Sequence, residues 1–118
     1  MDEKNRLDKE DQILEEIEEF VSDEVLQTDG VSRLVGSLTK NISANLLGLD
    51  AGTKGVRITK EGNILTIYIH LTVFYGINIP QISYDIQTNI KQVIEATSGL
   101  KVNAINISVE GIDQKKTD

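Results

Sequence analysis

The feature that most constrains the fold is a strand, a helix and a second strand that follow one another in the second half of the chain. In residues 64–75, every odd-numbered position from 65 to 73 is aliphatic, while the even-numbered positions from 66 to 74 carry threonine, histidine or an aromatic residue. This alternation predicts a long strand with one side toward a core. A helix over residues 79–98 and a strand over residues 102–111 complete a βαβ unit, whose right-handed crossover makes the two strands parallel.

The predicted helix has clear boundaries in the sequence. Asn78 is placed to act as its N-cap, and Gln81 follows at the spacing of a capping box. Pro80 falls in the first turn, where its missing N–H leaves no hydrogen bond unmade. Gly99 is placed to end the helix in the left-handed conformation, with Leu100 folding back onto it.

A hairpin is predicted in front of the long strand. A short alternating segment that starts at Gly55 runs into Glu61 and Gly62, which together form a turn signal. A two-residue turn at this position pairs Ile58 with Leu65 and places both side chains on the core face.

The acidic charge of the chain is concentrated in an amphipathic helix predicted for residues 9–26. Residues 1–29 contain 12 acidic and 3 basic residues, whereas the remainder contains 7 acidic and 9 basic, for a total of −7. Glu15, Glu16 and Glu19 belong either to a solvated helix face or to a docking surface for a basic partner. The apolar stripe of this helix consists of Ile13, Leu14, Ile17, Phe20, Val21 and Val25.

Residues 9–112 are predicted to form a single domain, between a disordered acidic N-terminus (1–8) and a disordered polar tail (113–118). Residues 31–54 are a variable helical or loop segment, with apolar positions at helical spacing but three glycines. Such a segment covers the core, docks a partner or lies on a membrane surface. The predicted fold class is α+β, in the order helix, strand, strand, helix, strand, with a small mixed sheet and the helices packed on one face.

No catalytic, cofactor or metal site is predicted. The chain has no cysteine, and His70 is its one histidine, so a histidine-based metal site would have only carboxylates as further ligands. No segment resembles a nucleophile elbow or a glycine-rich phosphate loop. The charged N-terminus does not resemble a signal peptide, and no apolar run is long enough to span a membrane. We therefore expect a non-enzymatic protein of the cytoplasm.

A candidate binding surface lies on the mixed side of the long strand. Tyr68, His70 and Phe74 alternate with aliphatic residues and therefore share one face. Both predicted helices are needed on the aliphatic face, so these side chains are expected to contact a partner protein or a second copy. The alternative is that residues 31–54 fold over them.

Four segments, in order and with matching spacing, resemble the alkaline-shock or general-stress (Gls-type) protein family of Gram-positive bacteria. Together they lie within residues 53–112, about half of the chain. The acidic helix and its exit at Gly30 and Val31 are also similar to that family. The four segments are residues 53–58 (TKGVRI), 73–80 (VFYGINIP), 87–91 (QTNIK) and 97–112 (TSGLKVNAINISVEGI).

The resemblance implies a cytoplasmic protein of the stress response, with a role in cell-envelope homeostasis and no established catalytic residues. Some relatives are held at the membrane by a separate anchor protein, and others are associated with lipid metabolism. We therefore expect a protein partner, such as a membrane-anchored one, or self-association. The alternative function is a KH-like RNA-binding module, because this order of elements also occurs in such folds. One Gly-x-x-Gly sequence is present, at residues 52–55, but the acidic charge of the chain is unfavourable for nucleic acid.

Overall fold

A computed structural model of the chain describes residues 2–36 and 55–115. Its elements, in chain order, are α1 (Asp2–Gln27), β1 (Val31–Leu34), β2 (Val56–Glu61), β3 (Ile64–Phe74), α3 (Ile79–Ser98) and β4 (Lys101–Asp113).

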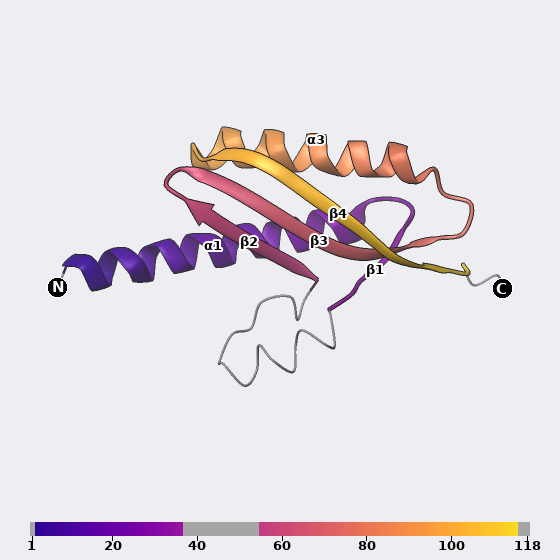
Figure 1. The fold of residues 1–118 in the computed structure, drawn as a ribbon, viewed down its shortest axis with the longest axis horizontal. Coiled ribbons are helices and arrows are strands. Elements are labelled where there is room, and N and C mark those ends of the chain that lie inside the picture. Colours follow the sequence, from indigo (N-terminus) through magenta and orange to yellow (C-terminus); the bar gives the residue numbers. More distant parts are fainter. Residues whose placement is uncertain (1, 37–54, 116–118) are drawn as a thin grey trace.

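The long strand β3 is the centre of a four-stranded sheet (Figure 1). β4 lies parallel to it along one edge, from Ile64 opposite Lys101 to Phe74 opposite Asp113. β1 and β2 both pair antiparallel with the other edge of β3. The parallel βαβ unit and the mixed α+β sheet predicted from the sequence are thus confirmed.

The β2–β3 hairpin has a different register from the predicted one. Ile58 pairs with Ile67 rather than with Leu65, and the turn consists of Gly62 and Asn63. Gly62 has a φ of 59°, so this glycine supplies the positive φ that a two-residue turn needs at its first central position. Because the shift is two residues, the predicted core side of both strands is unchanged.

Strand β1 replaces the start of the helical or loop segment that the sequence predicts from residue 31. It follows Gly30, whose φ of 100° turns the chain from α1 toward the sheet. The edge of β3 at residues 71–73 carries backbone groups that need partners, and β1 supplies them. The predicted helical stripe beyond residue 36 lies outside the described residues.

β1 and β2 lie end to end along β3 and meet at His70. The Val35 N–H donates to the His70 carbonyl over 2.9 Å, and the His70 N–H donates to the Gly55 carbonyl over 2.8 Å. Gly55 has a φ of 81°, and a Cβ there would approach backbone atoms of His70 and Val35 to 2.9 Å. Glycine is therefore required where the chain returns to the sheet.

Both terminal segments contain more regular structure than predicted. α1 begins at Asp2, inside the segment expected to be disordered, because residues 2–12 contain no glycine or proline and continue a helix that is packed further along. β4 ends at Asp113, where disorder was also expected, because this residue is paired with Phe74 of the central strand.

The core lies on one face of the sheet, beneath α1 and α3. Among the described residues, its 16 buried hydrophobic side chains include five consecutive odd-numbered positions of β3. α1 and α3 run antiparallel (Figure 1), and a hydrogen bond of 2.8 Å from Asn89 to Glu24 links them. α3 begins and ends as predicted: the Asn78 side chain accepts from the Gln81 N–H, and Gly99 is left-handed. The buried set is Ile17, Val21, Val25, Val31, Val56, Leu65, Ile67, Ile69, Leu71, Val73, Ile82, Ile86, Ile90, Ile94, Val102 and Ile105.

Candidate functional site

The sheet face opposite the helices, called the open face below, carries the predicted partner-binding residues Tyr68, His70 and Phe74. All three are partly buried, and none belongs to the hydrophobic core cluster. The Arg57 guanidinium lies 4.2 Å from the centroid of the Tyr68 ring, a distance typical of a cation–π contact. The Lys115 ammonium lies 6.0 Å from the Phe74 ring, at the outer limit of such contacts. The two aromatic rings therefore already have partners within the chain.

His70 is held by the neighbouring strand β4. Its Nδ1 lies 3.0 Å from a carboxylate oxygen of Glu110, which also accepts a hydrogen bond from the Ser108 hydroxyl. Glu110 occupies this position because the register between β3 and β4 shifts there, from Leu71 opposite Val109 to Thr72 opposite Gly111. The shift leaves Glu110 as the extra residue of a bulge.

A second polar cluster joins three strands at the end of the sheet, and we call it the Asp113 clamp. The Asp113 carboxylate accepts hydrogen bonds from Ser32 of β1 at 2.7 Å and from Thr72 of β3 at 2.9 Å, and the Arg33 Nε lies 3.2 Å away. These hydrogen bonds, first that from Ser32, hold the pKa of Asp113 below its ordinary value. Thr72 is only 3% exposed, so the clamp also satisfies a buried hydroxyl.

The three acidic residues predicted as a docking surface, Glu15, Glu16 and Glu19, are all exposed on α1. α1 packs on the helix-covered face of the sheet, so the sheet separates these carboxylates from Tyr68 and Phe74. The residues proposed from the sequence thus lie on two separate surfaces. Glu16 also lines a cavity.

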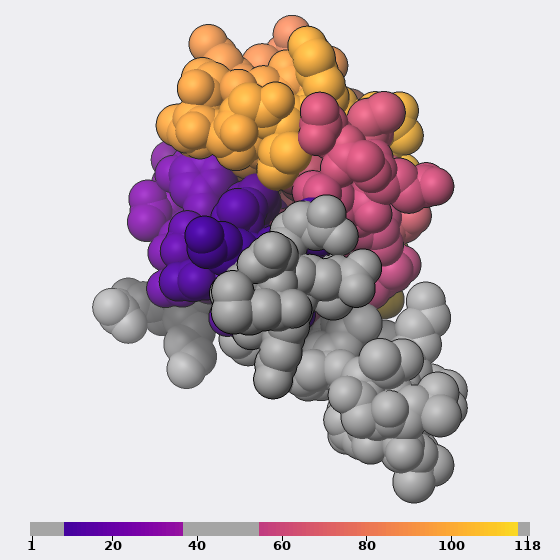
Figure 2. Space-filling model, turned by 90° about the vertical axis from the view of Figure 1, so that its left-hand side faces the viewer, coloured from indigo at the N-terminus to yellow at the C-terminus, as the bar shows by residue number. Residues whose placement is uncertain are grey.

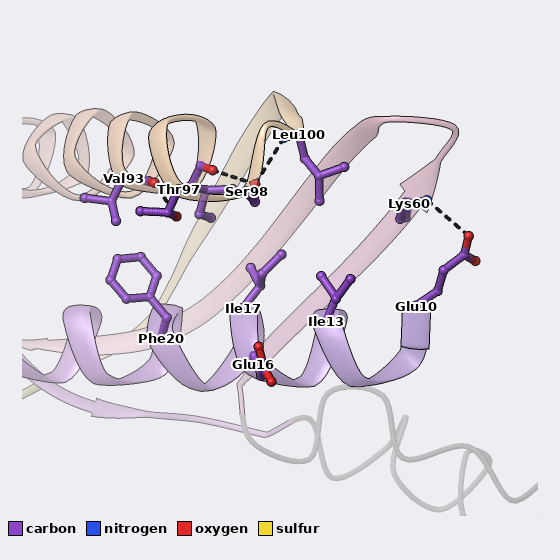
Figure 3. Close-up of a pocket in the computed structure, with 11 residues that line it drawn as sticks. Glu10, Ile13, Glu16, Ile17, Phe20, Lys60, Val93, Thr97, Ser98 and Leu100 are labelled. Carbon is purple, nitrogen blue, oxygen red and sulfur yellow. Dashed lines mark hydrogen bonds and ion pairs between the residues drawn. The ribbon is translucent and has the colours of Figure 1, made fainter. Parts of the chain in front are cut away.

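That cavity is an open groove of about 540 Å³ between α1 and α3, called the α1–α3 groove below (Figure 3). The contact between the helices is closed near the link from Asn89 to Glu24 and opens toward the start of α1 and the end of α3. Figure 2 shows the end of the molecule where α1, the end of α3 and the β2–β3 hairpin adjoin one another. The groove is lined by Glu10, Ile13, Glu16, Ile17, Phe20, Lys60, Val93, Ile94, Thr97, Ser98 and Leu100.

The lining of the groove is apolar at its centre and charged at its rim. Ile17 and Ile94 are buried beneath it, whereas the Ile13 side chain at its edge is 44% exposed. At one end, Lys60 of β2 lies 3.9 Å from Glu10 of α1 (Figure 3). Such a site, apolar with a few polar groups around it, is typical of a binding surface.

The groove was not predicted from the sequence. Ile13 and Phe20 were assigned to the apolar stripe of the first helix, and Leu100 to the end of the second. The sequence feature that could have indicated the groove is the pair Thr97 and Ser98 in the last turn of α3. Both side chains are small and polar, so the apolar stripe of α1 has no large apolar side chain opposite it there.

Within residues 2–36 and 55–115, no group of three or more His, Cys, Asp or Glu side chains is arranged to hold a metal ion. Within the same two ranges, neither helix combines the length and the apolar character that a membrane crossing requires.

Sequence comparisons find proteins similar to this chain in Bacillus subtilis and Streptococcus pyogenes. It is 30% identical to the uncharacterized protein YloU of Bacillus subtilis over 83 residues, which cover 67% of this chain and 69% of YloU. It is 29% identical to YqhY of the same organism, covering 73% and 63% of the two chains. A match to the protein Spy1535 of Streptococcus pyogenes, at 35% identity, covers 54% of this chain and 50% of that one. No solved structure gave a significant match.

The family comparison covers nearly the whole chain. The Asp23 family, whose name does not refer to a residue of this chain, matches residues 1–114 and is described as having a cell envelope-related function. This match extends through every helix and strand that the structure describes, from α1 to β4. The resemblance noted in the sequence is thereby confirmed, and the chain belongs to the Asp23 family, with its cell envelope-related function.

Proposed function

We propose that this protein is a non-enzymatic adaptor with a cell envelope-related function, and that it binds a protein partner in the α1–α3 groove. The observation that carries the proposal is the exposure of Ile13 at the edge of an apolar groove of about 540 Å³. Grouped apolar surface of this kind marks interaction sites on soluble domains, whereas single exposed apolar residues are ordinary.

The polar groups of the open face support this choice of surface. His70 is bonded to Glu110, and Tyr68 is covered by Arg57. A partner that docked on the open face would have to displace these contacts, whereas a partner in the groove would cover apolar surface without breaking any of them. The groove therefore offers the more favourable docking surface of the two.

The acidic character of the chain favours attachment through a protein rather than through lipid. The cytoplasmic leaflet of a bacterial membrane is anionic and attracts basic segments. This chain has a net charge of −7, and the excess lies in α1, which forms one wall of the groove. We accordingly place the protein in the cytoplasm, held near the envelope by its partner. A role of this protein in the stress response or in membrane lipid metabolism would then depend on binding to that partner.

Site-specific photocrosslinking in the native host tests the proposal. A photoreactive residue at Ile13 is expected to capture a defined envelope protein, identified by mass spectrometry. The matched control is the same residue at Leu26, which lies on the same helix with 49% exposure but outside the groove. Replacing Glu15, Glu16 and Glu19 together by lysine should leave the fold intact and reduce capture. Identical products at both positions would overturn the groove as the binding site.

A further inference from the structure

The walls of the α1–α3 groove restrict the kind of segment that can enter it. Both walls are helices, whose backbone hydrogen bonds are satisfied within each helix. A strand in the groove would leave its own N–H and C=O groups without partners, at a cost comparable to lost hydrogen bonds. A helix satisfies its own backbone, so it is the form in which a peptide segment can bury apolar side chains there.

The size of the groove matches one face of such a helix. A cavity of about 150 Å³ lined by leucine, isoleucine and phenylalanine holds one benzene molecule, so about 540 Å³ has room for about three large apolar side chains. Along α1, the lining extends from Glu10 to Phe20, a rise of roughly 15 Å. Three anchors at positions i, i+4 and i+7 of a helix span roughly 11 Å.

The charge around the groove identifies the chemistry of that helix. α1 contains 11 acidic and 3 basic residues, a net charge of −8. On the opposite wall, α3 contains Asp85, Lys91 and Glu95, a net charge of −1. Of the rim residues, Lys60 already lies beside Glu10, and Glu16 adds a further exposed carboxylate. A basic segment is attracted to this surface, whereas a second copy of this acidic chain or an anionic amphiphile is repelled.

We propose that the occupant of the α1–α3 groove is a basic amphipathic helix of the partner protein. It places three apolar side chains on Ile13, Ile17 and Phe20 and directs lysine or arginine toward the α1 carboxylates. This inference rests on the proposed function, because it names the chemical class of the partner segment at the same site.

Binding of labelled synthetic helices, followed by fluorescence anisotropy, tests the inference. Three peptides of about 20 residues, long enough to form an isolated helix, are compared. The first has leucine at i, i+4 and i+7 with lysine on its other face. The second has glutamate in place of lysine, and the third is a scramble of the first with equal charge. The first peptide is expected to bind at least tenfold more tightly than either of the others, and to weaken as salt is raised.

Two single substitutions and one control locate the binding. Ile13→Ser should weaken binding of the basic helix about tenfold, and Glu16→Lys several-fold, whereas the equally exposed control Leu26→Ser should leave it unchanged. Thermal melting of each variant checks that the fold is intact.

Each other outcome would overturn the inference. Equal binding of the scrambled peptide would mean that charge alone attracts it, and equal binding of the acidic helix would remove the electrostatic argument. Ile13-dependent binding to anionic vesicles, or Ile13-dependent dimerisation in light scattering, would assign the groove to a membrane or to a second copy. If no peptide binds while Ile13 still crosslinks to an envelope protein, the basic helix is wrong and the proposed function stands. If crosslinking is also absent, both are wrong.

Discussion

The two faces of the sheet differ in whether their partly exposed side chains already make contacts within the chain. On the open face, the side chains that stand out in the sequence already have partners: Arg57 covers Tyr68, and Glu110 holds His70. On the helix-covered face, Ile13 borders a groove and is 44% exposed. An aromatic residue on a strand is therefore weaker support for a binding site than an aliphatic residue at the edge of an incompletely filled helix contact.

The largest expected difference between the faces is in stability, at two adjacent residues of β3. Ile69 is fully buried beneath the helices, so Ile69→Ala should lower the free energy of unfolding by about 2–5 kcal/mol. His70 points to the open face, where its pairing with Glu110 is partly exposed, so His70→Ala should cost about 1 kcal/mol or less. Urea denaturation measures both changes, and equal losses would contradict the distinction between the faces.

Phe74→Ala challenges the comparison directly, because the sequence predicts that Phe74 and Tyr68 contact a second copy or a partner. Truncating a buried aromatic residue costs about 3–5 kcal/mol, and we expect a much smaller loss here because Phe74 lies outside the core cluster. The variant is measured by thermal melting together with light scattering and partner capture. Weakened association in a stable variant would move the binding surface to the open face. A collapse of the melting temperature would instead show that Phe74 is a core residue.

A smaller effect is expected where α3 begins. The Asn78 side chain accepts from the Gln81 N–H over 3.0 Å, so Asn78→Ala should lower the free energy of unfolding by about 1 kcal/mol. Asn78→Ser is the matched control, because serine also accepts at the N-cap and should retain most of the stability. An unchanged denaturation midpoint in the alanine variant would show that the cap contributes nothing to holding α3 over the sheet.

The smallest effect belongs to the Asp113 clamp and depends on pH. Because folding lowers the pKa of Asp113, its carboxylate stabilises the fold above its ordinary pKa of 3.8. This contribution is lost as the pH falls through the lowered value. Asp113→Asn should therefore reduce stability near neutral pH, and the difference from the wild type should shrink in acid. Asp29→Asn, at an exposed residue, controls for net charge. A difference that does not change with pH would exclude this role of the carboxylate.

The parts of the fold that local rules determine were predictable from the sequence. The cap at Asn78, the left-handed Gly99 and the alternation of β3 follow from the residues themselves. Strand β1 was not predictable, because residues 31–34 carry no strand pattern of their own and become a strand only by pairing with the free edge of β3. The predicted pairing between β2 and β3 was wrong by two residues. Both possible two-residue turns contain Gly62, and both leave each side chain on the same face of the sheet, so the alternating pattern does not distinguish them.

The candidate site was less predictable than the fold. The exposure of Glu15, Glu16 and Glu19 agrees with the amphipathic pattern of α1. The α1–α3 groove depends on how far the contact between two helices extends, which no local pattern specifies. The Asp113 carboxylate bonds to residues that lie 41 to 81 positions earlier in the chain, and no local pattern connects them. The sequence alone therefore predicts that Asp113 belongs to a polar tail.

The meeting of β1 and β2 at His70 has a consequence for how this chain can change. The chain leaves the sheet at Val35 and returns at Gly55, and both residues bond to the same residue of β3. The entropy cost of joining two fixed points by a flexible connection grows only with the logarithm of its length, by about 0.6 kcal/mol for each doubling. Connections of different length between Val35 and Gly55 are therefore compatible with the same sheet. The position between Val35 and Gly55 is thus a natural insertion site, at which a member of this family can acquire a new segment while the helices, the groove and the clamp stay as they are.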